Sequence, residues 1–117
     1  MVNYLSDDLG VQLDQLCKQL DVSVKQLRKS GTNYAQAEKD YKMLLRTECL
    51  KLRDAGMAIG MIDKVAYGIP SVANARFNRD VAEAVYKANL ESINAIKLQM
   101  RILENQISRE WGSETSG

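Results

Sequence analysis

The chain has 117 residues, of which 45% are hydrophobic and 26% charged, and its 16 basic and 15 acidic residues leave a formal net charge of +1. Because the charges also balance within residues 1–30 and 81–117, we expect neither strong sequence-independent binding of nucleic acid nor attraction to an anionic membrane. The chain has no histidine, the commonest general base and metal ligand, so the sequence argues against an enzyme and predicts no cofactor and no metal site.

The first half of the chain predicts two helices or one continuous helix. Two helices would cover about residues 6–29 and 32–55, with Asn33 as the N-cap of the second. The alternative is a single rod with a weak point at Gly31, where glycine costs about 1 kcal/mol relative to alanine. Heptad spacing of apolar residues on both sides of the glycine supports the rod: Leu9, Leu13, Leu16, Leu20, Leu27, Tyr34, Ala37, Tyr41 and Leu44.

The second half predicts a short helix, residues 59–67, and a very long one, residues 71–111, which contains no proline or glycine. A polar tail, residues 113–117, is expected to be disordered. At 1.5 Å per residue the long helix would span roughly 60 Å, too much for a compact globule of this size. We therefore predict an all-α fold in one domain, residues 1–112: an elongated antiparallel helical hairpin or three-helix bundle with coiled-coil character.

Two apolar stripes run along the predicted long helix, on nearly opposite sides. The first begins at Ala82 and alternates steps of four and three residues, and it predicts an oligomer seam: Tyr86, Asn89, Ile93, Ile96, Met100, Leu103 and Ile107. The second comprises Val81, Ala84, Ala88, Ala95, Leu98 and Ile102. A helix with two apolar sides needs two neighbours, so we expect a homo-oligomer, most simply a homodimer. The residues expected to contact a partner protein are Tyr67, Leu98, Ile102 and Trp111.

A short internal repeat links the two halves of the chain. Residues 37–42 (AEKDYK) and 82–87 (AEAVYK) share four of their six residues. In an antiparallel hairpin that turns near residue 63, this repeat would place Tyr41 close to Tyr86. The alternative is coincidence in a helix-rich sequence.

The segment around Gly68 resembles the turn and recognition-helix start of a helix-turn-helix. In that interpretation a set of polar and basic residues would face a DNA groove: Lys64, Ser71, Asn74, Arg76 and Arg79. The simpler interpretation, which we favour, is a turn between two helices whose arginines are solvated. The helix that follows is far longer than a recognition helix, and the surrounding charge is weak.

Cys17 and Cys49 lie on separate predicted segments beside leucines, which is typical of free buried thiols in a reducing compartment; a disulfide or a reactive thiol is the minor alternative. The glycines lack the Lys-Ser/Thr of a phosphate-binding loop. Carboxylates such as Glu38 and Glu83 have the spacing of solvated helix pairs. The N-terminal residues do not form a signal peptide, and no apolar run could span a membrane, so we expect a cytoplasmic protein with no membrane partner.

Four segments resemble small helical proteins encoded by phages and prophages of Gram-positive bacteria: residues 31–42, 52–57, 75–86 and 101–112. The ending RILENQISREW is the most specific of them. This resemblance implies a phage accessory protein that acts inside a bacterial host cell, and it assigns no functional residue.

With an enzyme argued against, the sequence leaves three candidate functions. The first is a non-enzymatic phage protein that binds a host or phage protein, either inhibiting a defence system as anti-CRISPR proteins do or redirecting a host protein. The second is a DNA-associated accessory in replication or recombination that uses the turn around Gly68. The third is an assembly scaffold or chaperone. We favour the first.

Overall fold

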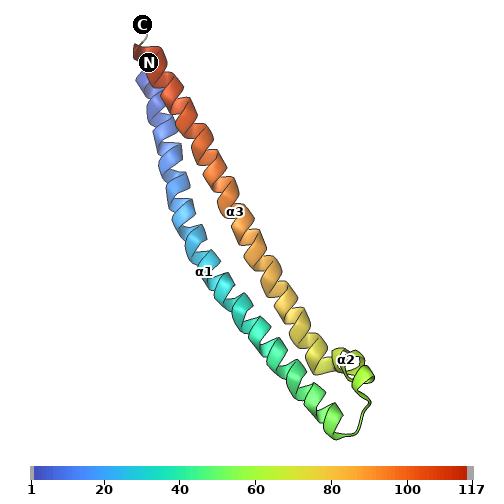
Figure 1. The fold of residues 1–117 in the computed structure, drawn as a ribbon. Helices are drawn as coiled ribbons and strands as arrows, with labels where there is room; N and C mark the ends of the chain where they lie inside the picture. The colour runs from blue at the N-terminus through green and yellow to red at the C-terminus, as the bar shows by residue number, and fades with distance from the viewer. Residues whose placement is uncertain (1, 116–117) are drawn as a thin grey trace. The chain divides into compact units, whose positions relative to one another are not determined.

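A computed structural model describes the backbone of residues 2–115 and the side chains of residues 8–112. The described residues form three helices and no strand: α1 (Val2–Asp54), α2 (Ile59–Tyr67) and α3 (Pro70–Thr115) (Figure 1). The predicted all-α fold with a very long C-terminal helix is therefore confirmed.

The first helix is continuous through Gly31, so the single rod is the correct alternative and the break between residues 29 and 32 is wrong. Asn33 lies inside the helix and is not an N-cap. The Thr32 hydroxyl donates to the carbonyl of Arg28 at 3.0 Å, which is the bond of a side chain within a regular helix. Gly31 has a packing role instead, because a Cβ built there would lie 3.2 Å from the ring of Tyr86.

A glycine with a left-handed backbone conformation follows the end of α1. Gly56 has φ of 90°, and its backbone N–H donates to the carbonyl of Arg53 at 3.0 Å. The next N–H, of Met57, donates to the carbonyl of Leu52 at 3.1 Å. These bonds satisfy carbonyls that the helix end would otherwise leave unpaired, and they turn the chain towards α2.

Only two residues, Gly68 and Ile69, separate α2 from α3. Ala66 of α2 and Val72 of α3 are both 0% exposed, and Ile62 is 8% exposed. Ala66 and Val72 are therefore the most completely buried residues on the two sides of this sharp turn.

The last helix continues beyond its predicted end at Trp111. Gly112 lies within α3, which runs to Thr115. A single glycine costs about 1 kcal/mol relative to alanine but leaves the backbone hydrogen bonds possible, so it need not end a helix. Of the predicted disordered tail, residues 113–115 are helical, whereas Ser116 and Gly117 lie outside the described residues.

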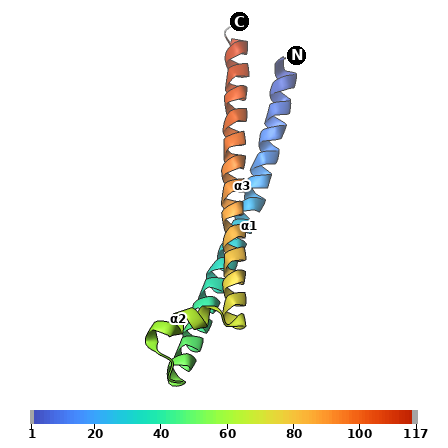
Figure 2. The same ribbon diagram turned by 90° about the vertical axis from the view of Figure 1, so that its right-hand side faces the viewer.

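The contacts group the chain into two units, residues 1–27 with 88–117 and residues 28–87. In the first unit the side-chain amide of Asn89 donates to the carbonyl of Gln26 at 3.5 Å, and farther along Leu16 and Leu103 line one groove. The chain segments of this unit are therefore antiparallel, as Figures 1 and 2 also show. Leu9 and Ile93 are its buried apolar side chains.

The predicted oligomer seam lies largely inside the chain. Ile93 is 6% exposed. The other seam residues are half-buried: Tyr86, Asn89, Ile96, Met100, Leu103 and Ile107. The hydrogen bond of Asn89 to Gln26, and the groove that Leu103 lines together with Leu16, show that α1 of the same chain lies along this side of α3. The second stripe is exposed, with Leu98 at 53% and Ile102 at 50%.

The antiparallel register in residues 28–87 differs from the predicted one by one heptad. Tyr86 meets Tyr34, with ring centroids 6.0 Å apart, and Tyr41 meets Arg79. The predicted contact between Tyr41 and Tyr86 is therefore wrong. Heptad repeats present similar residues one heptad apart, so their spacing alone does not select the register.

Candidate interaction surfaces

Arg79 is the centre of a polar cluster between α1 and α3. Its Nη2 lies 2.9 Å from the carboxylate of Asp80, and its Nη1 lies 3.9 Å from that of Glu38. Its guanidinium also lies 4.8 Å from the centroid of the Tyr41 ring. Tyr41 is only 6% exposed, so this cation–π contact forms at the edge of the core. Arg79 thus interacts with residues of both α1 and α3, and its role in contacting DNA stays a prediction.

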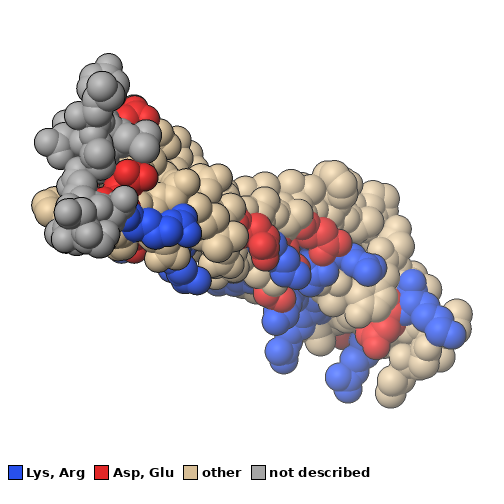
Figure 3. Space-filling view, turned by 90° about the horizontal axis from the view of Figure 1, so that it is seen from above, with Lys and Arg blue, Asp and Glu red and all other residues tan. Residues whose placement is uncertain are grey.

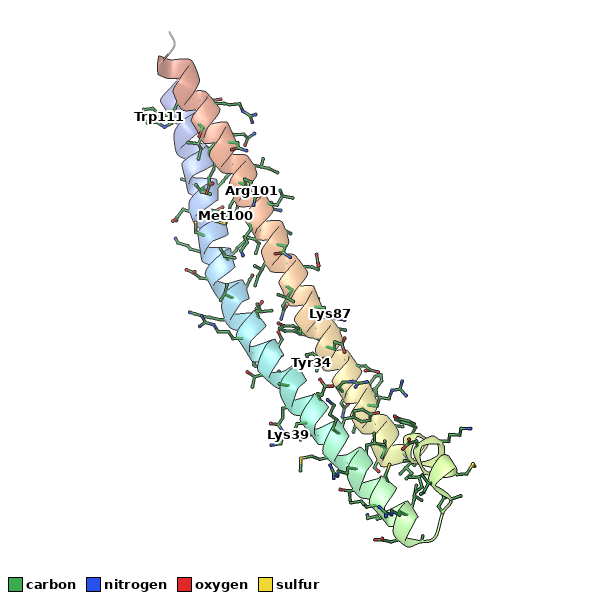
Figure 4. All side chains as sticks on the ribbon, in the orientation of Figure 1. Tyr34, Lys39, Lys87, Met100, Arg101 and Trp111 are labelled. Atoms are coloured by element: carbon green, nitrogen blue, oxygen red, sulfur yellow. The ribbon has the colours of Figure 1, made fainter. Side chains whose placement is uncertain are left out.

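Tyr34, Glu83 and Lys87 extend this cluster by one turn of α3. The Lys87 ammonium lies 2.7 Å from the Glu83 carboxylate. Figure 4 labels Tyr34 on the side of α1 that faces α3, with Lys87 on α3. The hydrogen bond and the charge of Lys87 lower the pKa of Glu83, and the same pair raises the pKa of Lys87. Burial and the charges of Glu38 and Glu83 raise the pKa of Tyr34.

These shifts predict that acid weakens the Glu83–Lys87 pair and with it the stability of α3. A carboxyl group whose pKa is lower in the folded state stabilises the fold above its unfolded pKa, and this stabilisation is lost as the pH falls through the folded pKa. We expect the thermal midpoint, followed by circular dichroism, to fall between pH 7 and about pH 3, because an unfolded glutamate titrates near 4.3. The fall should be smaller in Glu83→Gln.

The control for this prediction is Glu91→Gln. Glu91 is an exposed glutamate on the same helix, and no ion pair is recorded for it in the described part of the chain. Its substitution should leave the acid sensitivity at the wild-type level. Equal acid sensitivity of Glu83→Gln and wild type would show that the Glu83–Lys87 pair has no role in the pH response.

An apolar groove lies beside this cluster, between α1 and α3 within residues 28–87. On α3, Phe77, Val81 and Val85 follow one another at four-residue intervals and are 66%, 46% and 49% exposed. The α1 residues that line the groove beside this row, Ser30 and Asn33, have short polar side chains. The lining residues are Ser30, Asn33, Phe77, Asn78, Val81, Ala82 and Val85. Because small residues of α1 stand opposite large apolar residues of α3, the latter remain uncovered.

The residues predicted to bind a partner are exposed and are divided between the two units. Tyr67 is 45% exposed and belongs to residues 28–87, with the Arg76 guanidinium 5.9 Å from its ring centroid. Leu98, Ile102 and Trp111 are exposed but belong to the other unit, residues 1–27 with 88–117. The sequence interpretation missed Phe77 and Val85. Their four-residue spacing with Val81 was the available signal, because it places all three on one helix face.

The helix-turn-helix interpretation finds little support in the geometry around Gly68. Lys64, Ser71, Asn74 and Arg76 are exposed, whereas Arg79 is committed to the polar cluster. Two residues link the helices, with the N–H of Gly68 and of Ile69 bonded to carbonyls of α2. A helix-turn-helix usually has a turn of three to four residues. These residues therefore belong to a tight helix–helix corner.

Among the described residues, no group of three or more Cys, Asp or Glu side chains could hold a metal ion. None of the described helices is long and apolar enough to cross a membrane. Cys17 is exposed and Cys49 half-buried, and both are free thiols, so the minor alternative of a disulfide is wrong and the predicted burial of Cys17 is too. No protein family, curated protein or solved structure matches the chain.

Proposed function

We propose that this chain is a non-enzymatic interaction protein that works by docking another protein in the apolar groove of residues 28–87. The observation that carries the proposal is the exposed row of Phe77, Val81 and Val85 beside the low wall formed by Ser30 and Asn33. Large apolar side chains that are contiguous and bordered by polar residues mark interaction surfaces on proteins. A phenylalanine at the end of such a row is the kind of side chain that anchors an interface.

The shape of the groove favours a helix as its occupant. Residues at four-residue intervals on α3 present a straight apolar ridge, and an amphipathic helix places its own apolar residues at three- and four-residue intervals. The exposed polar side chains that line the groove, Asn33 and Asn78, are uncharged, and Ser30 is buried at its wall. We therefore propose a partner helix with an apolar face and an uncharged polar border.

The resemblance to phage-encoded proteins suggests the cellular context in which this docking would occur. In that setting the partner is a host or phage protein inside an infected bacterium, and docking inhibits a defence factor or redirects a host enzyme. A second copy of the chain is the alternative occupant, because its own row of Phe77, Val81 and Val85 could pack against the same row of the first copy.

The test compares the double variant Phe77→Gln, Val81→Gln with the control Val11→Gln. Val11 is 57% exposed but belongs to the other unit, and all three positions are exposed on helices, so glutamine should preserve the fold. Tagged proteins would be used for capture from host lysate, and their mass in solution would be measured by analytical ultracentrifugation.

We expect a protein captured by wild type and by Val11→Gln to be lost with the double variant. Loss of an oligomer in the double variant alone would identify a second copy as the occupant. Identical captured proteins and identical mass for all three chains would contradict the proposal.

A further inference from the structure

A row of basic side chains runs along one face of α1 in the second unit. At about 100° per residue, Arg28, Lys39, Lys42, Arg46 and Arg53 lie within roughly 60° of one another around the helix. All five are exposed. We call this set the basic stripe. Tyr34 and Tyr41, which contact α3, lie on the other side of the helix, and Figure 4 shows Lys39 on the side of α1 away from α3.

The basic stripe contains no carboxylate. The short residues Thr32 and Ala35 occupy the same face between Arg28 and Lys39, and no ion pair is recorded for Arg28, Lys39, Arg46 or Arg53 in the described part of the chain. Lys42 has one weak pair, with Glu38 at 3.5 Å, in which the lysine side chain is 69% exposed. Exposed pairs of this kind contribute about 0–1 kcal/mol, so Lys42 remains available to another anion.

The same face of α1 has a different character before Arg28. There Lys18 is paired with Asp14 at 3.2 Å, and Asp21 precedes Lys25 by four residues. Residues 28–87 carry eleven basic and seven acidic residues, whereas the rest of the chain carries five and eight. This unit therefore has a net charge of +4, although charges balance within residues 1–30 and 81–117. In the view of Figure 3, Lys and Arg side chains project along the lower edge.

We propose that the basic stripe binds the phosphate backbone of duplex nucleic acid without reading its sequence. Arg28 and Arg53 are 25 residues apart, which corresponds to about 38 Å along the helix and is close to one turn of a DNA duplex, about 34–36 Å. Lys39, Lys42 and Arg46 lie together between them, within about 10 Å of helix axis. Thr32 and Ala35 keep the helix surface low, so a phosphate backbone can approach closely.

Two other polyanionic partners fit the stripe less well. A protein interface normally excludes charged residues from its centre and places aromatic residues there, whereas this face has five cations and no aromatic residue. A helix that binds a membrane surface immerses a broad apolar face. Here only Met43 and Leu50 border the stripe, two turns apart, and the remaining apolar side of α1 packs against α3.

The test measures binding of the full chain to a labelled 30-base-pair DNA duplex by fluorescence anisotropy between 50 and 200 mM salt. The variant is the triple substitution Lys39→Gln, Lys42→Gln, Arg46→Gln. The control, Lys97→Gln, Arg101→Gln, Arg109→Gln, removes the same charge from exposed positions of α3. Circular dichroism would check that both variants keep the helical content of wild type.

For wild type we expect a slope of log K against log salt of about −4 to −5, because each of five neutralised phosphates contributes about −0.9. The triple variant of the stripe should lose between two and three units of this slope and at least tenfold in affinity at 50 mM salt, whereas the α3 control should lose neither. A second duplex of unrelated sequence should bind with the same affinity.

Four outcomes would overturn the proposal. The first is absence of binding to either duplex at 50 mM salt. The second is equal loss in the stripe variant and the α3 control, and the third is loss in Arg76→Gln alone, which would transfer the site to the corner around Gly68. Vesicles with anionic lipids and poly-glutamate serve as competitors. Binding that either abolishes at a lower charge concentration than unlabelled duplex would show that the stripe recognises that partner instead.

Discussion

Replacing Val72 by aspartate is expected to unfold the corner where α2 packs against the start of α3. Val72 is 0% exposed and is the largest fully buried side chain among the described residues. A carboxylate at this position would be buried without a cation, because the buried side chains of the same corner are Ile62 and Ala66. Burying an unpaired charge costs about 3 kcal/mol or more, which is a large part of the stability of a small domain.

Hydrogen exchange followed by mass spectrometry would locate the effect. Peptides that cover residues 59–75 should lose protection in Val72→Asp, while peptides from residues 8–27 should keep most of theirs. Val72→Ala is the matched variant. It removes two methyl groups without adding charge and should cost about 2 kcal/mol, measured by urea unfolding. Wild-type protection of residues 59–75 in Val72→Asp would show that this corner does not need a buried apolar side chain.

Replacing Gly31 by leucine is expected to separate α1 from α3 around Tyr86. A Cβ at residue 31 would lie 3.2 Å from Cε1 and 3.5 Å from Cδ1 of the Tyr86 ring, and leucine adds three further carbon atoms beyond it. The ring must move, and its contact with Tyr34 moves with it. Forcing extra carbon atoms into a packed contact typically costs 1–3 kcal/mol, more than the roughly 1 kcal/mol that leucine adds in helix propensity.

Gly10→Leu is the control, because nothing lies within 4 Å of a Cβ built at Gly10. At residue 10 the substitution changes only the helix propensity, which is higher for leucine than for glycine, so we expect the fold to be stabilised by up to about 1 kcal/mol. The two variants should therefore change the urea midpoint in opposite directions. Stabilisation of similar size at both positions would mean that α1 and α3 are not in close contact at Gly31.

The basic stripe and the apolar groove show why the candidate surfaces were hard to predict. Basic and acidic residues balance within residues 1–30 and within residues 81–117. A helix, however, distributes charged side chains among its faces, and the fold groups residues 28–87 into one unit with an excess of basic residues. The stripe follows from a helical projection of α1 only once the helix is known to continue through Gly31. The groove requires in addition that Ser30 and Asn33 lie opposite Phe77, which depends on the register.

The sequence by itself determined that the chain is helical throughout, but not whether α1 continues through Gly31, because helix formation depends on local propensity and on the three- and four-residue spacing of apolar residues. The long α3 follows from the absence of proline and glycine between Ser71 and Trp111. The partner of the first α3 stripe was decided only by the tertiary structure. A heptad stripe specifies that some helix covers it, and the chain's own α1 and a second copy satisfy that requirement equally.

The tertiary structure also decided the role of single residues whose types have several uses. The sequence gives no sign that Arg79 lies beside Glu38 and Tyr41 of α1. Gly31 resembled a helix break until the ring of Tyr86 proved to need the space. In both cases the deciding contact joins residues more than 35 positions apart, so no local pattern contains it. The heptad repeat permits several registers of α1 against α3. The register that packs the side chains best is the one that brings these residues into contact.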